Sequence, residues 1–159
     1  YEHACENEES KGMGTTLVTA YFLATGCYLV HVGDSRAYRL RDGKLERLSK
    51  DHSLANEYVE MGLLRADEVQ TFPYKNVITR ACGLSETVEP ESEFHTLQSG
   101  DLFLFCSDGL TDPLNDNDIL NLLKNNVDLD QTCEALLDAA NEGGGPDNIT
   151  VVLAEAIEE

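Results

Sequence analysis

A run of apolar residues that ends in two aspartates constrains the fold most strongly. Leu102–Cys106 reads LFLFC, and Ser107 then leads into Asp108 and Asp112, which flank Gly109. A short continuous apolar run rich in aromatic residues is typical of a buried strand. Burying a charge is costly unless it has a partner. The sequence therefore places two carboxylates at the tip of a buried strand, where they meet either solvent or a cation.

Two more predicted strands carry an aspartate at one end, close to glycine. Asp34 follows Gly33 after the stretch 28–32, and Asp147 precedes the stretch 149–154. Glycine allows close backbone approach, so neighbouring strands of one sheet would bring these acids to one rim. Converged carboxylates need protons or a hard cation, and all-oxygen ligands suit Mg²⁺, Mn²⁺ or Ca²⁺. One such aspartate alone is more often a turn or cap residue, but the repetition favours metal binding.

The rest of the pattern predicts strands, a mixed segment, a strand, two helices and a last strand. Residues 1–11 are polar and acidic, and we expect them to be frayed. Asp116 and Asp130 are expected to cap the two late helices. The order indicates an α+β fold with mostly antiparallel sheets, as a single domain over residues 1–159. We expect strands over 15–24, 27–32, 37–40, 44–48, 77–81, 102–106 and 149–154, and helical spacing over 54–70 with a second start near 66.

The charge and the cysteines narrow the partners and the compartment. Asp and Glu number 30 against 11 Lys and Arg, a formal net charge of −19. This argues against binding to nucleic acid, whose affinity rests on neutralising phosphates, and against anionic membranes. The 5 cysteines form no CxxC motif, so a reducing cytoplasm is expected rather than a disulfide framework. No apolar run in this segment is long enough to span a membrane.

Six short segments occur in an order that resembles a known family. Together they are similar to the later motifs of metal-dependent protein phosphatases of the PPM (type 2C) family, across nearly the whole chain. The resemblance implies a sandwich of two antiparallel β-sheets flanked by helices (α-β-β-α), here with the N-terminal strands missing and with a flap-like insertion at about 54–78. The segments are Gly12–Thr16 (GMGTT), Gly33–Tyr38 (GDSRAY), Asp51–Ser53 (DHS), Arg80–Gly83 (RACG), Ser107–Asp112 (SDGLTD) and Gly144–Thr150 (GGPDNIT).

The resemblance also implies a chemistry, which is hydrolysis of phosphoserine or phosphothreonine in proteins by a metal-bound water, as part of signalling. The implied cofactors are two core Mn²⁺ or Mg²⁺ ions and a weaker third ion. Asp108 and Asp147 match ligands of one core ion, whereas Asp34, Asp108 and Asp112 match the acids around the additional site. The implied partners are a phosphorylated protein substrate and a cognate Ser/Thr kinase.

The sequence departs from the family pattern at its start. The family begins with an Arg followed by an acidic pair, and then has an Asp-Gly-x-Gly-Gly-His element. These supply the phosphate-binding Arg, the carboxylate that bridges two ions and the His that protonates the leaving group. None of them occurs here, and neither His31 nor His52 replaces that His by motif. No residue is therefore assigned a direct catalytic role, and we expect this chain, which resembles the C-terminal two-thirds of the domain, to be inactive alone.

Three alternatives stay open. The first is a catalytically dead phosphatase-like module that binds a phosphoprotein or regulates a kinase, although the retained aspartates argue against it. The second is a phosphatase of an anti-sigma-factor antagonist, although those enzymes typically lack the insertion at 54–78. The third is an acidic Ca²⁺-binding domain, which would prefer Ca²⁺ to Mn²⁺ and cleave no phosphate ester. A cysteine phosphatase is not indicated, because Cys82, Cys106 and Cys27 have no Arg six residues later.

Overall fold

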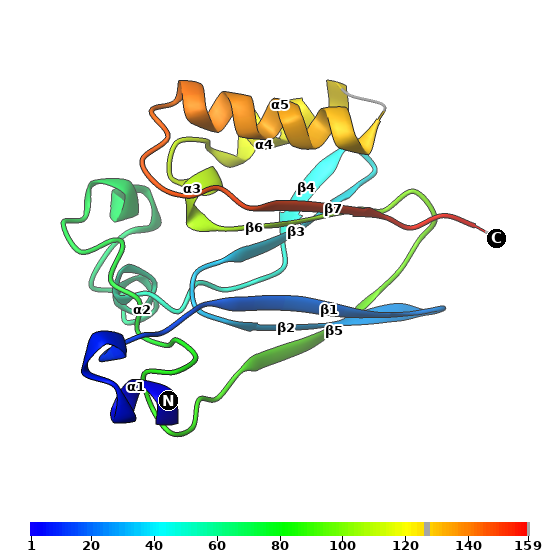
Figure 1. Cartoon of the computed structure of the whole chain (residues 1–159). Coiled ribbons are helices and arrows are strands. Elements are labelled where there is room, and N and C mark those ends of the chain that lie inside the picture. Colours follow the sequence, from blue (N-terminus) through cyan, green and yellow to red (C-terminus); the bar gives the residue numbers. More distant parts are fainter. Residues whose placement is uncertain (126–127, 159) are drawn as a thin grey trace.

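The computed structural model describes residues 1–125 and 128–158, and in them two antiparallel sheets face each other (Figure 1). One sheet has the strand order β1-β2-β5 and the other β4-β3-β6-β7. The α+β sandwich expected from the sequence is confirmed. The strands are β1 (Leu17–Leu23), β2 (Gly26–Val32), β3 (Arg36–Arg41), β4 (Lys44–Arg47), β5 (Glu91–Thr96), β6 (Leu102–Cys106) and β7 (Val151–Glu155).

The apolar sequence of β6 follows from its position in the fold, because both faces of this strand are buried. Phe103 points toward the other sheet, where its ring meets that of Phe22 edge to face at 5.2 Å between centroids. Leu104 points the opposite way, toward the helices α4 (Asp116–Asn125) and α5 (Leu129–Glu142), which cover the outer side of its sheet (Figure 1). A strand covered on both faces lacks the polar alternation of a half-exposed strand.

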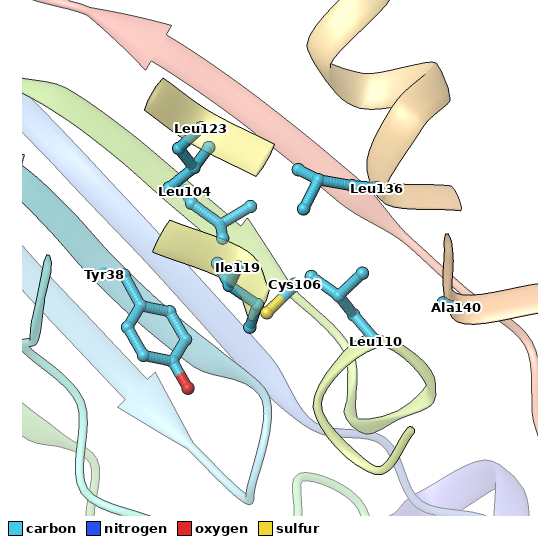
Figure 2. Close-up of a cluster of buried hydrophobic side chains, with 8 residues drawn as sticks. All are labelled: Tyr38, Leu104, Cys106, Leu110, Ile119, Leu123, Leu136 and Ala140. Carbon is cyan, nitrogen blue, oxygen red and sulfur yellow. The ribbon is translucent and has the colours of Figure 1, made fainter. Parts of the chain in front are cut away.

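The hydrophobic core under these helices is a single cluster (Figure 2). Removing a fully buried leucine side chain from such a core costs about 2–5 kcal/mol. The core thus fixes β6 and the turn that follows it, since Leu110 of that turn belongs to the same cluster. Its members are Tyr38, Leu104, Cys106, Leu110, Ile119, Leu123, Leu136 and Ala140.

The outer face of the β1-β2-β5 sheet has a different character. Tyr28 pairs with Tyr21 on one side and with Phe94 on the other. The rings of Tyr28 and Phe94 lie 5.0 Å apart, and all three side chains are exposed. This sheet therefore presents apolar groups outward, whereas the other sheet carries helices there.

The insertion between β4 and β5 contains the helix α2 (Leu54–Glu60) and the 3-10 helix η2 (Ala66–Thr71). The helical pattern expected over 54–70 is broken at Gly62, which has a positive φ of 70°. The strand expected over 77–81 is wrong. Within the described residues that stretch makes only an isolated bridge between Ser53 and Ile78, followed by one between Thr15 and Cys82.

The two helix caps lie one and two residues earlier than expected. Asn115 caps α4, since its Oδ1 accepts hydrogen bonds from the N–H groups of residues 117 and 118. Asp128 caps α5, since its Oδ1 accepts from the Gln131 N–H. Asp116 and Asp130 instead lie in the first turns, where their charge favours the positive end of the helix dipole.

Four short elements were not expected from the sequence. Residues 1–11 are not frayed but form the helix α1 (Glu2–Glu6) and the 3-10 turn η1 (Glu8–Ser10). Strand β5 (ESEFHT) was missed because its composition is largely polar. The helix α3 (Asp108–Thr111) follows β6 directly. Among the helices described, none is long and apolar enough to cross a membrane.

Candidate metal centre

Asp34 lies where the chain crosses from the first sheet to the second, between β2 and β3. Gly33 before it has φ +102°, and a side chain there would collide with Thr16, whose Cγ2 would lie 2.4 Å from the added Cβ. The Thr16 and Ser35 hydroxyls are hydrogen-bonded at 2.8 Å. The glycine-rich segment at 12–16 therefore packs directly against the turn that carries Asp34.

Asp108 and Asp112 lie on the short helix α3, immediately after β6. Asp108 is its first residue and Asp112 follows its last, and the Asp112 N–H donates to the Asp108 carbonyl at 2.8 Å. Residues four apart in a helix lie on the same face. The spacing seen in the sequence is therefore one helical turn that presents two carboxylates together.

Asp147 reaches this helix from the chain that leads into β7. Ser107 joins the two segments, because its Oγ donates to the Asn148 carbonyl (3.2 Å) and accepts from the Thr150 N–H (3.0 Å). Gly109 allows the contact, since an added Cβ would lie 2.4 Å from the Asn148 carbonyl oxygen. The SDGLTD and GGPDNIT segments therefore pack closely, backbone against backbone.

The acids converge at one edge of the β4-β3-β6-β7 sheet. Asp108 and Asp147 come from adjacent strands, since β6 pairs with β7. Asp34 follows β2 of the other sheet, but it also lies two residues before β3, which pairs with β6 through Arg36 and Cys106. The three strand ends therefore meet at one sheet rim as expected, although the strand that brings Asp34 there is the one after it. Asp34, Asp108 and Asp112 line one small cleft of about 40 Å³.

Burial and mutual repulsion raise the pKa values of two of these aspartates. Burial and the charge of Asp108 raise the pKa of Asp34 to about 6. Burial and the charges of Asp147 and Asp112 raise the pKa of Asp108. A cation would relieve both effects, because it stabilises the charged forms. The donor set is all oxygen, which fits a hard divalent cation.

A cation of the chain itself already faces these acids. Lys75 Nζ lies 3.1 Å from Asp112 Oδ1, and Asn76 Nδ2 donates to Asp112 Oδ2 at 3.4 Å. Both residues belong to the insertion after η2. Sequence reasoning missed them, and no motif in the insertion marks them.

Arg36 of the GDSRAY segment is committed to a structural pair rather than free to bind a ligand. Its Nη2 donates to Asp51 Oδ2 at 2.7 Å, and its Nε lies 3.1 Å from both oxygens of that carboxylate. Arg36 also donates to the Tyr38 hydroxyl, which donates to Asp116 (3.1 Å). The pair ties the GDSRAY and DHS segments together beside the cleft.

A larger groove of about 720 Å³ adjoins the cleft. It runs between the insertion (Asn56, Val59, Gln70) and the segment that leads from α3 into the first turn of α4 (Leu114, Asn117). The Arg36–Asp51 pair is shared by groove and cleft. The arrangement places a small acidic cleft at the edge of a groove several times larger.

The family model described as "Protein phosphatase 2C" matches residues 1–154. The chain belongs to the protein phosphatase 2C family.

Among its relatives, the protein phosphatase PhpP of Streptococcus pneumoniae is 36% identical over 154 residues, which are 97% of this chain and 63% of PhpP. The crystal structure of the Mycobacterium tuberculosis serine/threonine phosphatase PstP/Ppp superimposes with a TM-score of 0.93 at 38% identity, covering 99% of this chain and 66% of that one. The catalytic domain of PstP in complex with two manganese ions gives a TM-score of 0.88 at 34% identity, covering 99% of this chain and 65% of that one. The chain thus spans less than two thirds of these relatives.

Proposed function

We propose that the chain is the larger, C-terminal part of a metal-dependent protein serine/threonine phosphatase domain, with Asp34, Asp108, Asp112 and Asp147 as metal ligands. The observation that carries the proposal is the convergence of these carboxylates at the adjoining ends of β3, β6 and β7. Membership of the family and the two manganese ions of the PstP structure support Mn²⁺ or Mg²⁺ as the cofactor. The insertion at about 54–78 is proposed as the flap of the domain.

The four aspartates would serve two ions, and Asp108 would be a ligand of both. Asp108 and Asp147 would hold part of a core ion, and Asp34, Asp108 and Asp112 would surround an additional, weaker one. A bound divalent cation supplies a water of lowered pKa and neutralises charge on the phosphoryl group. The chain's own contribution is to hold these oxygens at the floor of a cleft, since electrostatic stabilisation depends on preorganised groups.

We propose the adjoining groove as the place for the polypeptide on either side of the phosphorylated residue. Its volume suits several side chains, and it opens directly onto the acidic cleft through the shared residues Arg36, Asp51 and Gln70. The cleft itself is small enough for only one reacting group. A phosphorylated protein is therefore the proposed substrate class, and a cognate Ser/Thr kinase the proposed partner.

The test is hydrolysis of p-nitrophenyl phosphate, with and without millimolar Mn²⁺, by this chain and by a version extended at its N-terminus with the family's first motifs. We expect Mn²⁺-dependent turnover in the extended version only, because Asp108 and Asp147 alone leave out the bridging carboxylate. Turnover by the 159-residue chain would contradict that account of the missing ligand. If both versions fold and neither turns over substrate, the phosphatase proposal fails and the binding-module alternative gains.

A further inference from the structure

A buried histidine, His52, forms hydrogen bonds with both backbone polar groups of Gly33, the residue before Asp34. The Gly33 N–H donates to His52 Nδ1 (3.1 Å), and the His52 N–H donates to the Gly33 carbonyl (3.0 Å). His52 is only 4% exposed. Its own carbonyl accepts from the Thr79 N–H (2.8 Å), where the chain returns from the insertion. One residue thus joins the turn of Asp34 to the base of the insertion.

The surroundings of His52 could suggest a second metal site, but their geometry argues against it. His31, His52 and Glu91 offer ligand atoms within 4.8 Å of one another, the one such group found among the described residues. The two imidazole rings are stacked, however, with centroids 5.0 Å apart and planes inclined by 19°. A metal ion lies close to the plane of each imidazole that binds it, and two stacked planes share no such point near both rings.

The hydrogen bonds also place the proton of His52. Because Nδ1 accepts from Gly33, the neutral ring carries its proton on Nε2, which is buried and lies 3.5 Å from Glu91 Oε1. A ring that binds a metal through Nε2 normally donates its other N–H, and here that position faces a donor. Burial, together with Arg80 and His31, lowers the pKa of His52 against the opposing effect of Glu91. The neutral, accepting form is the one the fold uses.

We infer that His52 is a positioning residue for Asp34. Its Nδ1 accepts from the Gly33 N–H and its backbone N–H donates to the Gly33 carbonyl, and these two bonds fix the direction of the Asp34 carboxylate. The inference rests on the proposed metal site, which it deepens. Gly33 has no side chain to hold it and adopts a conformation with positive φ, so its orientation depends on these external bonds. His52 itself touches neither the cleft nor a ligand, and it acts only through Gly33.

Two substitutions separate this role from simple packing. In His52→Asn the amide oxygen falls near the place of Nδ1 and can still accept from Gly33. In His52→Gln the amide nitrogen falls near the place of Nε2, so the contact toward Glu91 is kept while the acceptor for Gly33 is lost. His95→Gln is the matched control, since His95 is another largely buried histidine whose Nε2 makes no hydrogen bond and lies 3.8 Å from a glutamate, Glu93.

The measurements on the full chain are amide hydrogen exchange at Gly33 and Mn²⁺ binding followed by electron paramagnetic resonance. We expect His52→Gln to lose the protection of the Gly33 amide and to bind Mn²⁺ about 10-fold more weakly, as losses of metal-site supporting residues do. His52→Asn should restore most of both, and His95→Gln should change neither. Lost protection with unchanged Mn²⁺ affinity, or equal losses in Asn and Gln, would overturn the positioning role. A wild type that binds no Mn²⁺ would instead overturn the proposed metal site, and the inference with it.

Discussion

The ammonium of Lys75 and the carboxylate of Asp112 form an ion pair at 3.1 Å that links the insertion to the candidate metal centre. Both side chains are about 28–29% exposed, so the pair is partly shielded from water. A divalent cation that takes Asp112 as a ligand has to compete with this ammonium. The insertion and a cation bound at the proposed additional site would therefore compete for one carboxylate.

Lys75→Met should strengthen cation binding at this place. A partly exposed ion pair is worth up to about 1 kcal/mol, so we expect Mn²⁺ to bind two- to fivefold more tightly at the weaker site, measured by calorimetry. Lys124→Met is the control, because it removes the same charge from the end of α4. An equal gain in both variants would mean that net charge, and not the Asp112 pair, sets the affinity.

Asp108→Asn and Asp147→Asn should each abolish Mn²⁺-dependent hydrolysis of p-nitrophenyl phosphate in the N-terminally extended protein. The reason is the loss of a ligand charge at the proposed core ion, and for Asp108 also at the additional one. The fold should survive, because each change removes a repelling carboxylate from the cluster. Thermal unfolding in EDTA checks this, and activity that persists in either variant would exclude that residue as a core ligand.

The raised pKa of Asp34 predicts how stability depends on pH when no metal is bound. Its folded-state pKa of about 6 lies above the ordinary aspartate value of 3.8, so between these pH values the folded state holds a proton that the unfolded state has released. Stability should therefore fall as pH rises from about 4 to about 6, by on the order of 1–2 kcal/mol for this group after solvent screening. Urea unfolding in EDTA at pH 4.5 and 6.5 measures the fall.

Asp34→Asn removes this titration and serves as the comparison. The variant should lose the part of the pH dependence that Asp34 causes, so its stability relative to the wild type should rise with pH. Saturating Mn²⁺ should reverse the wild-type trend, because protons and cations compete for the same oxygens. Identical slopes for variant and wild type would show that Asp34 does not titrate in this range.

Asp101 supports the sheet far from the metal centre. It is 1% exposed, and it accepts from Arg41 Nε (2.6 Å) and from the Gln98 N–H (2.9 Å). Burial alone would raise the pKa of Asp101, but these bonds outweigh it and the pKa is lowered.

Asp101→Asn should cost about 3–5 kcal/mol of unfolding free energy, because it leaves Arg41 without its partner. Glu46→Gln removes the partner of Arg39 at a site where Glu46 is 58% exposed, and should cost less than about 1 kcal/mol. Urea unfolding at pH 7 compares the two variants. A carboxyl group whose pKa is lower in the folded state stabilises the fold at pH values above its unfolded-state pKa. The cost of Asp101→Asn should therefore shrink below about pH 4. Similar costs for the two variants would contradict the role of burial.

The sequence was most informative where one physical cause dominated. The apolar run of β6 has the same bounds in sequence and structure, Leu102–Cys106, because burial on both faces leaves no other pattern. The aspartate spacing in the SDGLTD segment was also readable, since it is one helical turn. Strand β5 could not be read, because its pairing with β2, and not its composition, makes it a strand.

The contacts at the candidate site that the sequence did not predict have a similar cause. That Asp34 reaches the site through the strand after it, and not through the strand before it, depends on how the strands are divided between the two sheets, which local patterns do not encode. The contacts of Lys75 with Asp112 and of His52 with Gly33 span 37 and 19 residues, with no periodicity to signal them. The helix caps lie one and two residues earlier than expected because Asn115 and Asp128, close to the chosen acids, cap equally well.

Asp34 lies two residues before β3 and Asp108 two residues after β6, and these strands pair at Arg36 and Cys106. The spacing of the two carboxylates is therefore set by backbone pairing within one sheet, and a cation that changes this spacing has to work against the hydrogen bonds of that pair.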